Sequence, residues 1–155
     1  MADLVTDGRD AFIRFWSSLH EATHRVTGGR ALDRVLGMPV VRLTTTGRRT
    51  GELRTTVLAA PVVEDERIIL VASNGGDDRD PQWYLNLLAH PTVRAARGTV
   101  DREFRGRVVA GTERSDLWRL IRSVTPVYEL YQRRTVRELP VIVLEPGGHA
   151  ADPVA

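Results

Sequence analysis

Hydrophobic positions change their spacing along the chain near Val40. Within residues 8–26 they recur every three or four residues, which is the period of one helix face. These positions are Phe12, Phe15, Trp16, Leu19, Thr23 and Val26. They predict an amphipathic N-terminal helix that ends at Gly28-Gly29, because glycine readily adopts the left-handed geometry found after helices. A second, short helix is expected over residues 31–36.

After Val40 the pattern becomes one of short β-rich runs separated by turn residues. The expected strands are 40–46, 53–63, 68–73, 93–97, 99–110 and 139–144, and the expected helices are 81–89, 113–124 and 127–132. Asp80 is expected to cap the first of these helices, with Pro81 in its first turn. The closely spaced strands favour antiparallel hairpins, because parallel pairing needs a long crossover. This order predicts an α+β protein built on a small closed or half-closed antiparallel barrel with peripheral helices.

Three parts are expected along the chain: an N-terminal amphipathic helical segment over 1–38, a barrel domain over 39–146 and a flexible tail over 147–155. The apolar stripe of the first part either closes the barrel or a homodimer seam, or rests on a membrane surface. The chain shows no signal peptide and no apolar run of membrane-spanning length. A cytoplasmic protein, with or without membrane association, is therefore expected.

Composition narrows the chemistry. All 22 basic residues are arginine, and the 155 residues include no cysteine, which excludes lysine Schiff bases, thiol nucleophiles and disulfides. The net charge of +2 does not favour nucleic-acid binding. His20 and His24 fit a zinc-binding helix pattern, but Arg30 stands where a third histidine would be needed, so no metal site is expected.

Four segments carry candidate chemistry. The glycine-bounded turn around Arg48-Arg49 is either an anion clamp or a solvated hairpin tip. The small residues after the strand ending near Ser73 either admit a flat ligand to the backbone or form an ordinary loop. Asn86 is expected beside apolar helix positions, where it either makes a structural hydrogen bond or contacts a ligand. Tyr128 and Tyr131 are either packing residues or proton donors in a pocket.

In combination, these segments resemble the deazaflavin-dependent nitroreductase family, the F420-dependent split-barrel proteins. The resemblance covers about residues 12–146. The matching stretches are Leu43-Thr44-Thr45-Thr46-Gly47-Arg48-Arg49-Thr50-Gly51 with Arg54, Val71-Ala72-Ser73-Asn74-Gly75-Gly76, Pro81-Gln82-Trp83-Tyr84-Leu85-Asn86-Leu87, residues 89–93, Tyr128-Glu129-Leu130-Tyr131-Gln132 and residues 139–144.

The resemblance implies a split barrel of the FMN-binding type that binds coenzyme F420, a deazaflavin with a phosphate and a polyglutamate tail. The implied cofactor-binding residues are Arg48, Arg49, Thr50, Arg54, Thr55, Thr56, Val57, Leu58, Val71, Ala72, Ser73, Asn74, Gly75, Gln82, Trp83, Tyr84, Leu85 and Asn86. Ser73, Tyr128 and Tyr131 are the implied catalytic residues, which would polarise the acceptor.

The implied reaction is hydride transfer from reduced F420 to a small-molecule acceptor such as a quinone, a nitro compound or an activated enone. The cofactor supplies the reactive carbon, so the protein mainly positions donor and acceptor. Two alternatives stay open at this point: an F420 carrier without catalytic activity, and an FMN-dependent oxidoreductase on the same fold.

Overall fold

The computed structural model describes residues 34, 35, 37–64 and 66–147. The chain divides into two units, residues 1–32 and 33–155, and the fold below is that of the second. The predicted N-terminal helix, its histidine pair and all but the first residue of the predicted tail lie outside the described residues. Within the described ranges no helix has the length and hydrophobicity that crossing a bilayer requires.

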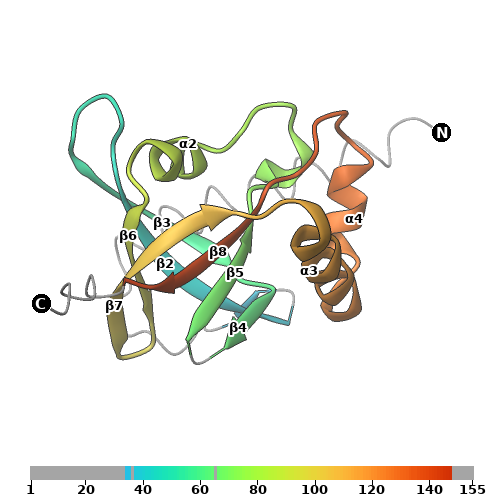
Figure 1. Cartoon of the computed structure of the whole chain (residues 1–155), viewed down its shortest axis with the longest axis horizontal. Coiled ribbons are helices and arrows are strands. Elements are labelled where there is room, and N and C mark those ends of the chain that lie inside the picture. The colour runs from blue at the N-terminus through green and yellow to red at the C-terminus, as the bar shows by residue number, and fades with distance from the viewer. Residues whose placement is uncertain (1–33, 36, 65, 148–155) are drawn as a thin grey trace, which may run out of the picture. The chain divides into compact units, whose positions relative to one another are not determined.

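An antiparallel sheet forms the body of this unit (Figure 1). Its eight strands are β1 (Arg34–Val35), β2 (Met38–Thr46), β3 (Leu53–Ala59), β4 (Val62–Glu64), β5 (Arg67–Val71), β6 (Thr92–Arg97), β7 (Val100–Val108) and β8 (Val141–Pro146). They run in the order β1-β2-β6-β7-β8-β5-β4, and β3 pairs with β2. The predicted α+β class is confirmed.

Pro61 separates two strands that the sequence predicted as one, over 53–63. The Ala60 N–H still donates to the Pro39 carbonyl at 2.8 Å, which extends the β2–β3 ladder by one bond. Proline has no N–H to continue that ladder, so the chain bends and β4 pairs with β5 instead. Within the described residues no ladder joins β3 to β4, so the sheet is open at this point, where a barrel was predicted.

The predicted helix over 31–36 is wrong at its described residues. Arg34 and Val35 form β1, which pairs with Pro39 and Met38 across a tight turn. Gly37 has a φ of +77°, a left-handed conformation that suits this turn and no helix interior.

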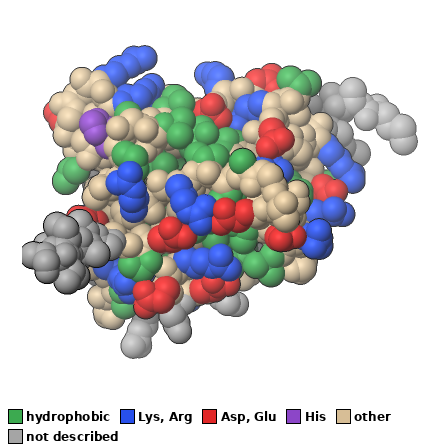
Figure 2. Space-filling model, viewed as in Figure 1, with side chains coloured by type: hydrophobic (Ala, Val, Ile, Leu, Met, Phe, Trp, Pro, Cys, Tyr) green, Lys and Arg blue, Asp and Glu red, His purple; other side chains and the backbone are tan. Residues whose placement is uncertain are grey.

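Within the part of the chain that the structure describes, three α-helices accompany the sheet: α2 (Gln82–Ala89), α3 (Gly111–Val124) and α4 (Val127–Gln132). Helical spacing predicts that Leu117, Leu120, Ile121 and Val124 are all buried by α3. Leu117 and Ile121 are buried, but Leu120 and Val124 are 38% and 49% exposed, so the prediction is wrong for these two. α3 is tied to the sheet by Arg107 of β7, whose guanidinium lies 2.7 Å from Glu113 and 3.0 Å from Glu145 of β8. Figure 2 shows such basic and acidic side chains alternating over this face.

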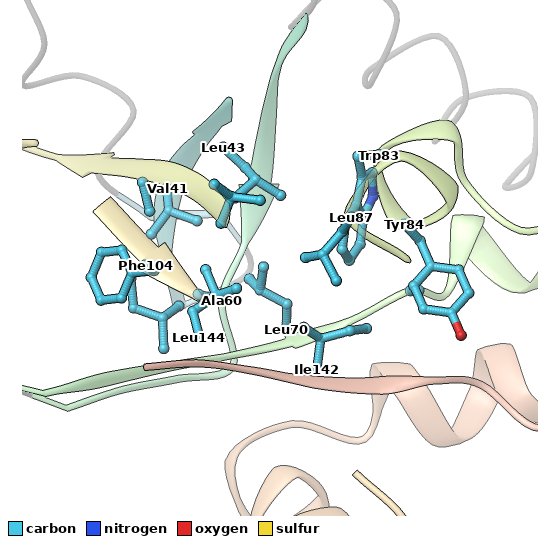
Figure 3. Packing of buried hydrophobic residues seen from close by; sticks show 14 residues of the cluster. Val41, Leu43, Ala60, Leu70, Trp83, Tyr84, Leu87, Phe104, Ile142 and Leu144 are labelled. Carbon is cyan, nitrogen blue, oxygen red and sulfur yellow. The ribbon is translucent and has the colours of Figure 1, made fainter. Parts of the chain in front are cut away.

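The core lies between the sheet and α2 (Figure 3). Trp83 and Leu87 of α2 point toward Leu43 and Leu70 of the sheet. Close approach of α2 depends on Gly106 of β7, where a Cβ would lie 2.6 Å from a Leu87 methyl carbon. This packing fixes α2 on the sheet, and with it the polar residues on the helix's other positions.

Candidate functional site

The turn between β2 and β3 is a closed loop at the end of a long hairpin (Figure 1). The Gly47 N–H donates to the Glu52 carbonyl at 2.7 Å, and the Gly51 N–H donates to the Gly47 carbonyl at 2.8 Å. Thr50 Oγ1 accepts a hydrogen bond from the Glu52 N–H at 3.2 Å. These bonds hold the two arginines of the turn, Arg48 and Arg49, at the hairpin tip, over which Figure 2 shows basic side chains.

Asn86 of α2 fastens this tip to the rest of the unit. Its Oδ1 accepts hydrogen bonds from the Arg48 N–H and the Arg48 Nη1, each at 3.2 Å. Its Nδ2 donates to Thr45 Oγ1 at 3.3 Å. Asn86 and Thr45 are 5% and 1% exposed, so the bond between them is shielded from water, which strengthens it, whereas the two bonds from Arg48 are partly buried. Asn86 thus makes the structural hydrogen bonds that one of its two interpretations predicted.

The arginines near the tip have different partners. Arg48 Nη1 also donates to Gln82 Oε1 at 3.0 Å, in the first turn of α2. Arg54 forms an exposed ion pair with Glu52 at 3.0 Å. Arg49 is exposed. The result is a cationic surface held at one edge by α2, with Arg49 directed to solvent.

Strand β3 contributes side chains to two faces. Directly opposed residues of antiparallel strands share a face, and Arg54, Thr56 and Leu58 oppose Thr45, Leu43 and Val41. Thr56 and Leu58 therefore lie on the core side, with Arg54 at the exposed end of the same face, whereas Thr55 and Val57 lie on the outer side. Among the described strands β3 pairs with β2 alone, so within the described residues no strand forms a ladder along its second edge.

The turn after β5 has an unusual backbone. Asn74, Gly75 and Gly76 have φ values of +45°, +65° and +83°, and they form a short 3-10 turn. Left-handed conformations are natural for glycine and uncommon for other residues, among which Asn adopts them more readily than most. The Gly76 N–H donates to the Ser73 carbonyl at 2.8 Å, and Asn74 Nδ2 donates to the Arg79 carbonyl at 3.1 Å. At Gly75 a Cβ would meet no atom within 4 Å, so this part of the turn is open.

Asp80 does not cap α2 as predicted. The N-cap position is Pro81, and no side chain caps the helix. The Asp80 carboxylate accepts a hydrogen bond from Arg137 Nη1 at 2.9 Å, which is a stronger, charge-assisted interaction. Thr135 Oγ1 donates to Asp78 Oδ1 at 2.8 Å beside it. Thr135 and Arg137, which precede β8, thus fix the position of Asp78 and Asp80, which precede α2.

Tyr128 and Tyr131 of α4 are buried, with their rings edge to face at 6.1 Å. Burial raises the pKa of Tyr131 to about 12, against an opposing effect of Arg134. Burial raises the pKa of Tyr128 further above its ordinary value. α4 contacts the turn after β5 directly, because a Cβ on Gly76 would lie 2.8 Å from the Tyr131 carbonyl oxygen. Both phenols stay protonated near neutral pH, so they can donate hydrogen bonds.

The structure gathers the predicted residues into two groups. The hairpin tip lies against Gln82 and Asn86 of α2, and the turn containing Ser73 lies against α4. Several predicted side chains belong to the core rather than to a surface: Val71, Ala72, Trp83 and Tyr84. Sequence reasoning missed Thr45, Thr135 and Arg137. Within the described residues no cluster of metal-binding side chains is present.

Comparison with known proteins gives consistent results. The model of the family described as F420H(2)-dependent quinone reductase matches residues 16–146. An F420H(2)-dependent quinone reductase of Mycobacterium tuberculosis is 37% identical over 130 residues, covering 81% of this chain and 87% of that protein.

Solved structures agree with this assignment. A structure named F420-H2 dependent reductase (FDR-A) is 38% identical, with a TM-score of 0.65, and covers 76% of this chain and all of that one. A chain described as a domain-swapped dimer is 33% identical, with a TM-score of 0.65, over 88% of this chain and 99% of that one. The fold and these relatives define an oxidoreductase. The chain belongs to the F420H(2)-dependent quinone reductase family.

Proposed function

We propose that this chain catalyses hydride transfer from reduced F420 to a quinone, and that the hairpin tip, the turn after β5 and α4 form its site. The observation that carries the proposal is the pair of hydrogen bonds that Arg48 donates to Asn86, called the Asn86–Arg48 latch below. It holds a cationic turn against the helix that begins next to the Ser73 turn. A family named for the same cofactor and acceptor supports it.

The residues present fit F420. Its anionic tail needs cations, and Arg48, Arg49 and Arg54 stand on or beside one turn. A ring needs backbone that it can approach closely, and Gly75 offers a turn with no Cβ and no atom where one would be. The edge of β3 opposite β2, which pairs with no other described strand, offers further N–H and C=O groups to the linker.

Each part of the chain has a separate task in this proposal. When bound, reduced F420 supplies a hydride and a proton, so that F420H2 and quinone become F420 and hydroquinone. Arg48 and Arg49 bind the tail, and Asn86 keeps Arg48 in place. Ser73 and the two protonated tyrosines donate hydrogen bonds toward the acceptor oxygen as negative charge develops on it.

Three further properties of the protein are proposed from its sequence: a split-barrel fold, a cytoplasmic location and a homodimeric state. The related chain described as a domain-swapped dimer supports the homodimer. Light scattering on the full chain measures the oligomeric state. Contact of residues 1–38 with a membrane and reduction of nitro compounds are likewise proposals. The carrier and FMN alternatives receive no support from the comparisons.

Titration of the purified full chain with F420, followed by the cofactor's fluorescence, tests the binding step. We expect micromolar or tighter binding, and oxidation of F420H2 when the quinone menadione is added. Tyr128→Phe removes one hydroxyl and keeps the buried ring, so we expect slower quinone reduction with nearly unchanged F420 binding. Absence of binding at micromolar concentrations would overturn the proposed function.

A further inference from the structure

Arg137 lies between α4 and β8 and reaches into the turn that follows β5. Its side chain is 16% exposed. It makes five hydrogen bonds: Nε to the Asp77 carbonyl at 2.8 Å, Nη1 to Asp80 Oδ1 at 2.9 Å, Nη2 to the Ser73 carbonyl at 2.9 Å, and both Nη1 and Nη2 to the Ala72 carbonyl at 3.2 Å. Every N–H of the guanidinium group therefore has an acceptor.

This saturation excludes a direct role in binding substrate or cofactor. A guanidinium group that holds an anionic ligand must have donors left for it, and those of Arg137 are used within the chain. Its charge is matched by Asp80 alone among its acceptors, and the others are backbone carbonyls. Arg137 thus acts on the shape of the backbone and not on a ligand.

The carbonyls that Arg137 binds lie on both sides of the left-handed turn. Ala72 and Ser73 precede Asn74, and Asp77 follows Gly76. Asn74 at a φ of +45° is held in a sparsely populated conformation, which persists only where surrounding contacts fix it. Arg137 fixes the two ends of this turn and so determines where Ser73 and the Gly75 backbone lie.

The same segment is also tied to α4. Gln132 Nε2, at the end of α4, donates to the Arg137 carbonyl at 2.7 Å, and its Oε1 accepts from the Leu139 N–H at 2.9 Å. The Arg137 N–H donates to Thr135 Oγ1 at 3.3 Å. Arg137 is therefore connected to the Ser73 turn through its side chain and to the helix carrying Tyr128 through its backbone.

We propose that Arg137 is the positioning residue that sets the distance between the Ser73 turn and α4, and that hydride transfer depends on it. The proposal rests on the proposed function, because it assigns Ser73 and Tyr128 to the same site. Displacement of a reacting group by about 1 Å can slow a reaction by about 100-fold. Loss of Arg137 should therefore slow the chemical step more than it weakens F420 binding.

Arg137→Lys is the first test, since it keeps the charge and loses the planar arrangement of donors. In single-turnover oxidation of bound F420H2 by saturating menadione, we expect a rate about 10- to 100-fold lower, with the Kd for F420 changed less than about threefold. Arg137→Ala with added guanidinium ion should regain part of the rate, and ammonium ion at the same concentration should not.

Arg114→Lys is the matched control. The Arg114 side chain is 18% exposed and also donates to a backbone carbonyl, that of Leu139, at 2.9 Å, but it has no contact with the Ser73 turn. We expect Arg114→Lys to lower the thermal midpoint of unfolding about as much as Arg137→Lys does. Its hydride-transfer rate should stay within about twofold of the wild type. If Arg137→Lys does not fold, Asp80→Asn replaces it, with a severalfold lower rate expected.

Three results would overturn this role: an Arg137→Lys rate within twofold of the wild type, an equal loss in Arg114→Lys, or rescue by ammonium ion as effective as by guanidinium. The proposed function fails by a different observation, namely a wild-type chain that neither binds F420 nor oxidises F420H2. The two failures are therefore distinguishable.

Discussion

The amide oxygen of Asn86 accepts hydrogen bonds from both the backbone and the guanidinium group of Arg48, each at 3.2 Å. Replacement by leucine, of similar volume, leaves the partly buried Arg48 N–H and the buried Thr45 hydroxyl without this partner. We expect Asn86→Leu to lower the free energy of unfolding by about 1–3 kcal/mol. We expect F420 binding about tenfold weaker, because the turn that carries Arg48 loses its anchor on α2. Chemical denaturation and fluorescence titration measure the two effects.

Thr45→Val is the control for Asn86→Leu. It removes only the buried hydrogen bond that Asn86 Nδ2 donates to Thr45 Oγ1 and keeps both bonds from Arg48. We expect about 1 kcal/mol of lost stability and F420 affinity within about twofold of the wild type. If Asn86→Leu bound F420 as tightly as the wild type, the Asn86–Arg48 latch would not be what positions Arg48.

Arg49 is exposed at the hairpin tip, so its contribution to binding should be electrostatic and sensitive to salt. We expect Arg49→Gln to raise the Kd for F420 by about threefold to tenfold at low ionic strength, and by less at high ionic strength, where charges are screened. Arg119→Gln is the comparison, because Arg119 is an exposed arginine of α3. Equal effects of the two substitutions would assign the change to net charge rather than to the tip.

Gly75 and Gly76 differ in what surrounds them. Both have positive φ, but only at Gly76 would a Cβ meet other atoms, 2.8 Å from the Tyr131 carbonyl oxygen and 3.0 Å from the Arg134 side chain. We expect Gly75→Ala to cost about 1 kcal/mol of stability, from backbone strain alone. Gly76→Ala should cost about 2–4 kcal/mol, because the turn must also move away from α4. Similar costs in denaturation experiments would contradict this close contact.

The buried tyrosines predict how stability depends on alkaline pH. The pKa of Tyr131 is raised from 10.0 to about 12 in the folded state, so above pH 10 the unfolded chain releases a proton that the folded chain retains. The stability contributed by Tyr131 is then fully present below pH 10 and falls between pH 10 and 12, by at most about 1.4 kcal/mol per pH unit.

Denaturation curves at pH 9, 10 and 11 measure this slope. We expect Tyr131→Phe to be less sensitive to alkaline pH than the wild type by the contribution of that one hydroxyl. Identical slopes in the two proteins would mean that the Tyr131 phenol titrates normally.

Local patterns predicted most of the described strands and helices, and the failures have definite physical causes. Alternating and continuous apolar runs gave β2, β5 and β8 with small errors at their ends. The run over 53–63 is divided because Pro61 has no N–H to donate to the ladder. The last bond of that ladder is the one from the Ala60 N–H to the Pro39 carbonyl, which only the folded structure shows. Leu120 and Val124 have helical spacing with Leu117, but helix periodicity does not say how wide the packed face is.

The sequence predicted which segments form the candidate site, but not how those segments contact one another. The paired arginines and the Asn74–Gly76 turn are visible in the sequence because turns have characteristic residues. The role of Arg137 is not, since an arginine among 22 carries no local sign that it will meet carbonyls some 60 residues earlier. Asp80 before Pro81 has the residue pattern of a helix cap, and only the folded chain shows that Arg137 takes it.

Strand β8 lies between β7 and β5, and its residues Val141, Ile142, Val143 and Leu144 are fully buried. It is the last of the described strands, yet its ladders alone among those described connect β4 and β5 to the other strands. During synthesis on the ribosome, the earlier strands therefore emerge as two incomplete sheets. A hydrogen-bonded ladder can join them only once β8 has left the exit tunnel, so β8 is the strand that completes the sheet.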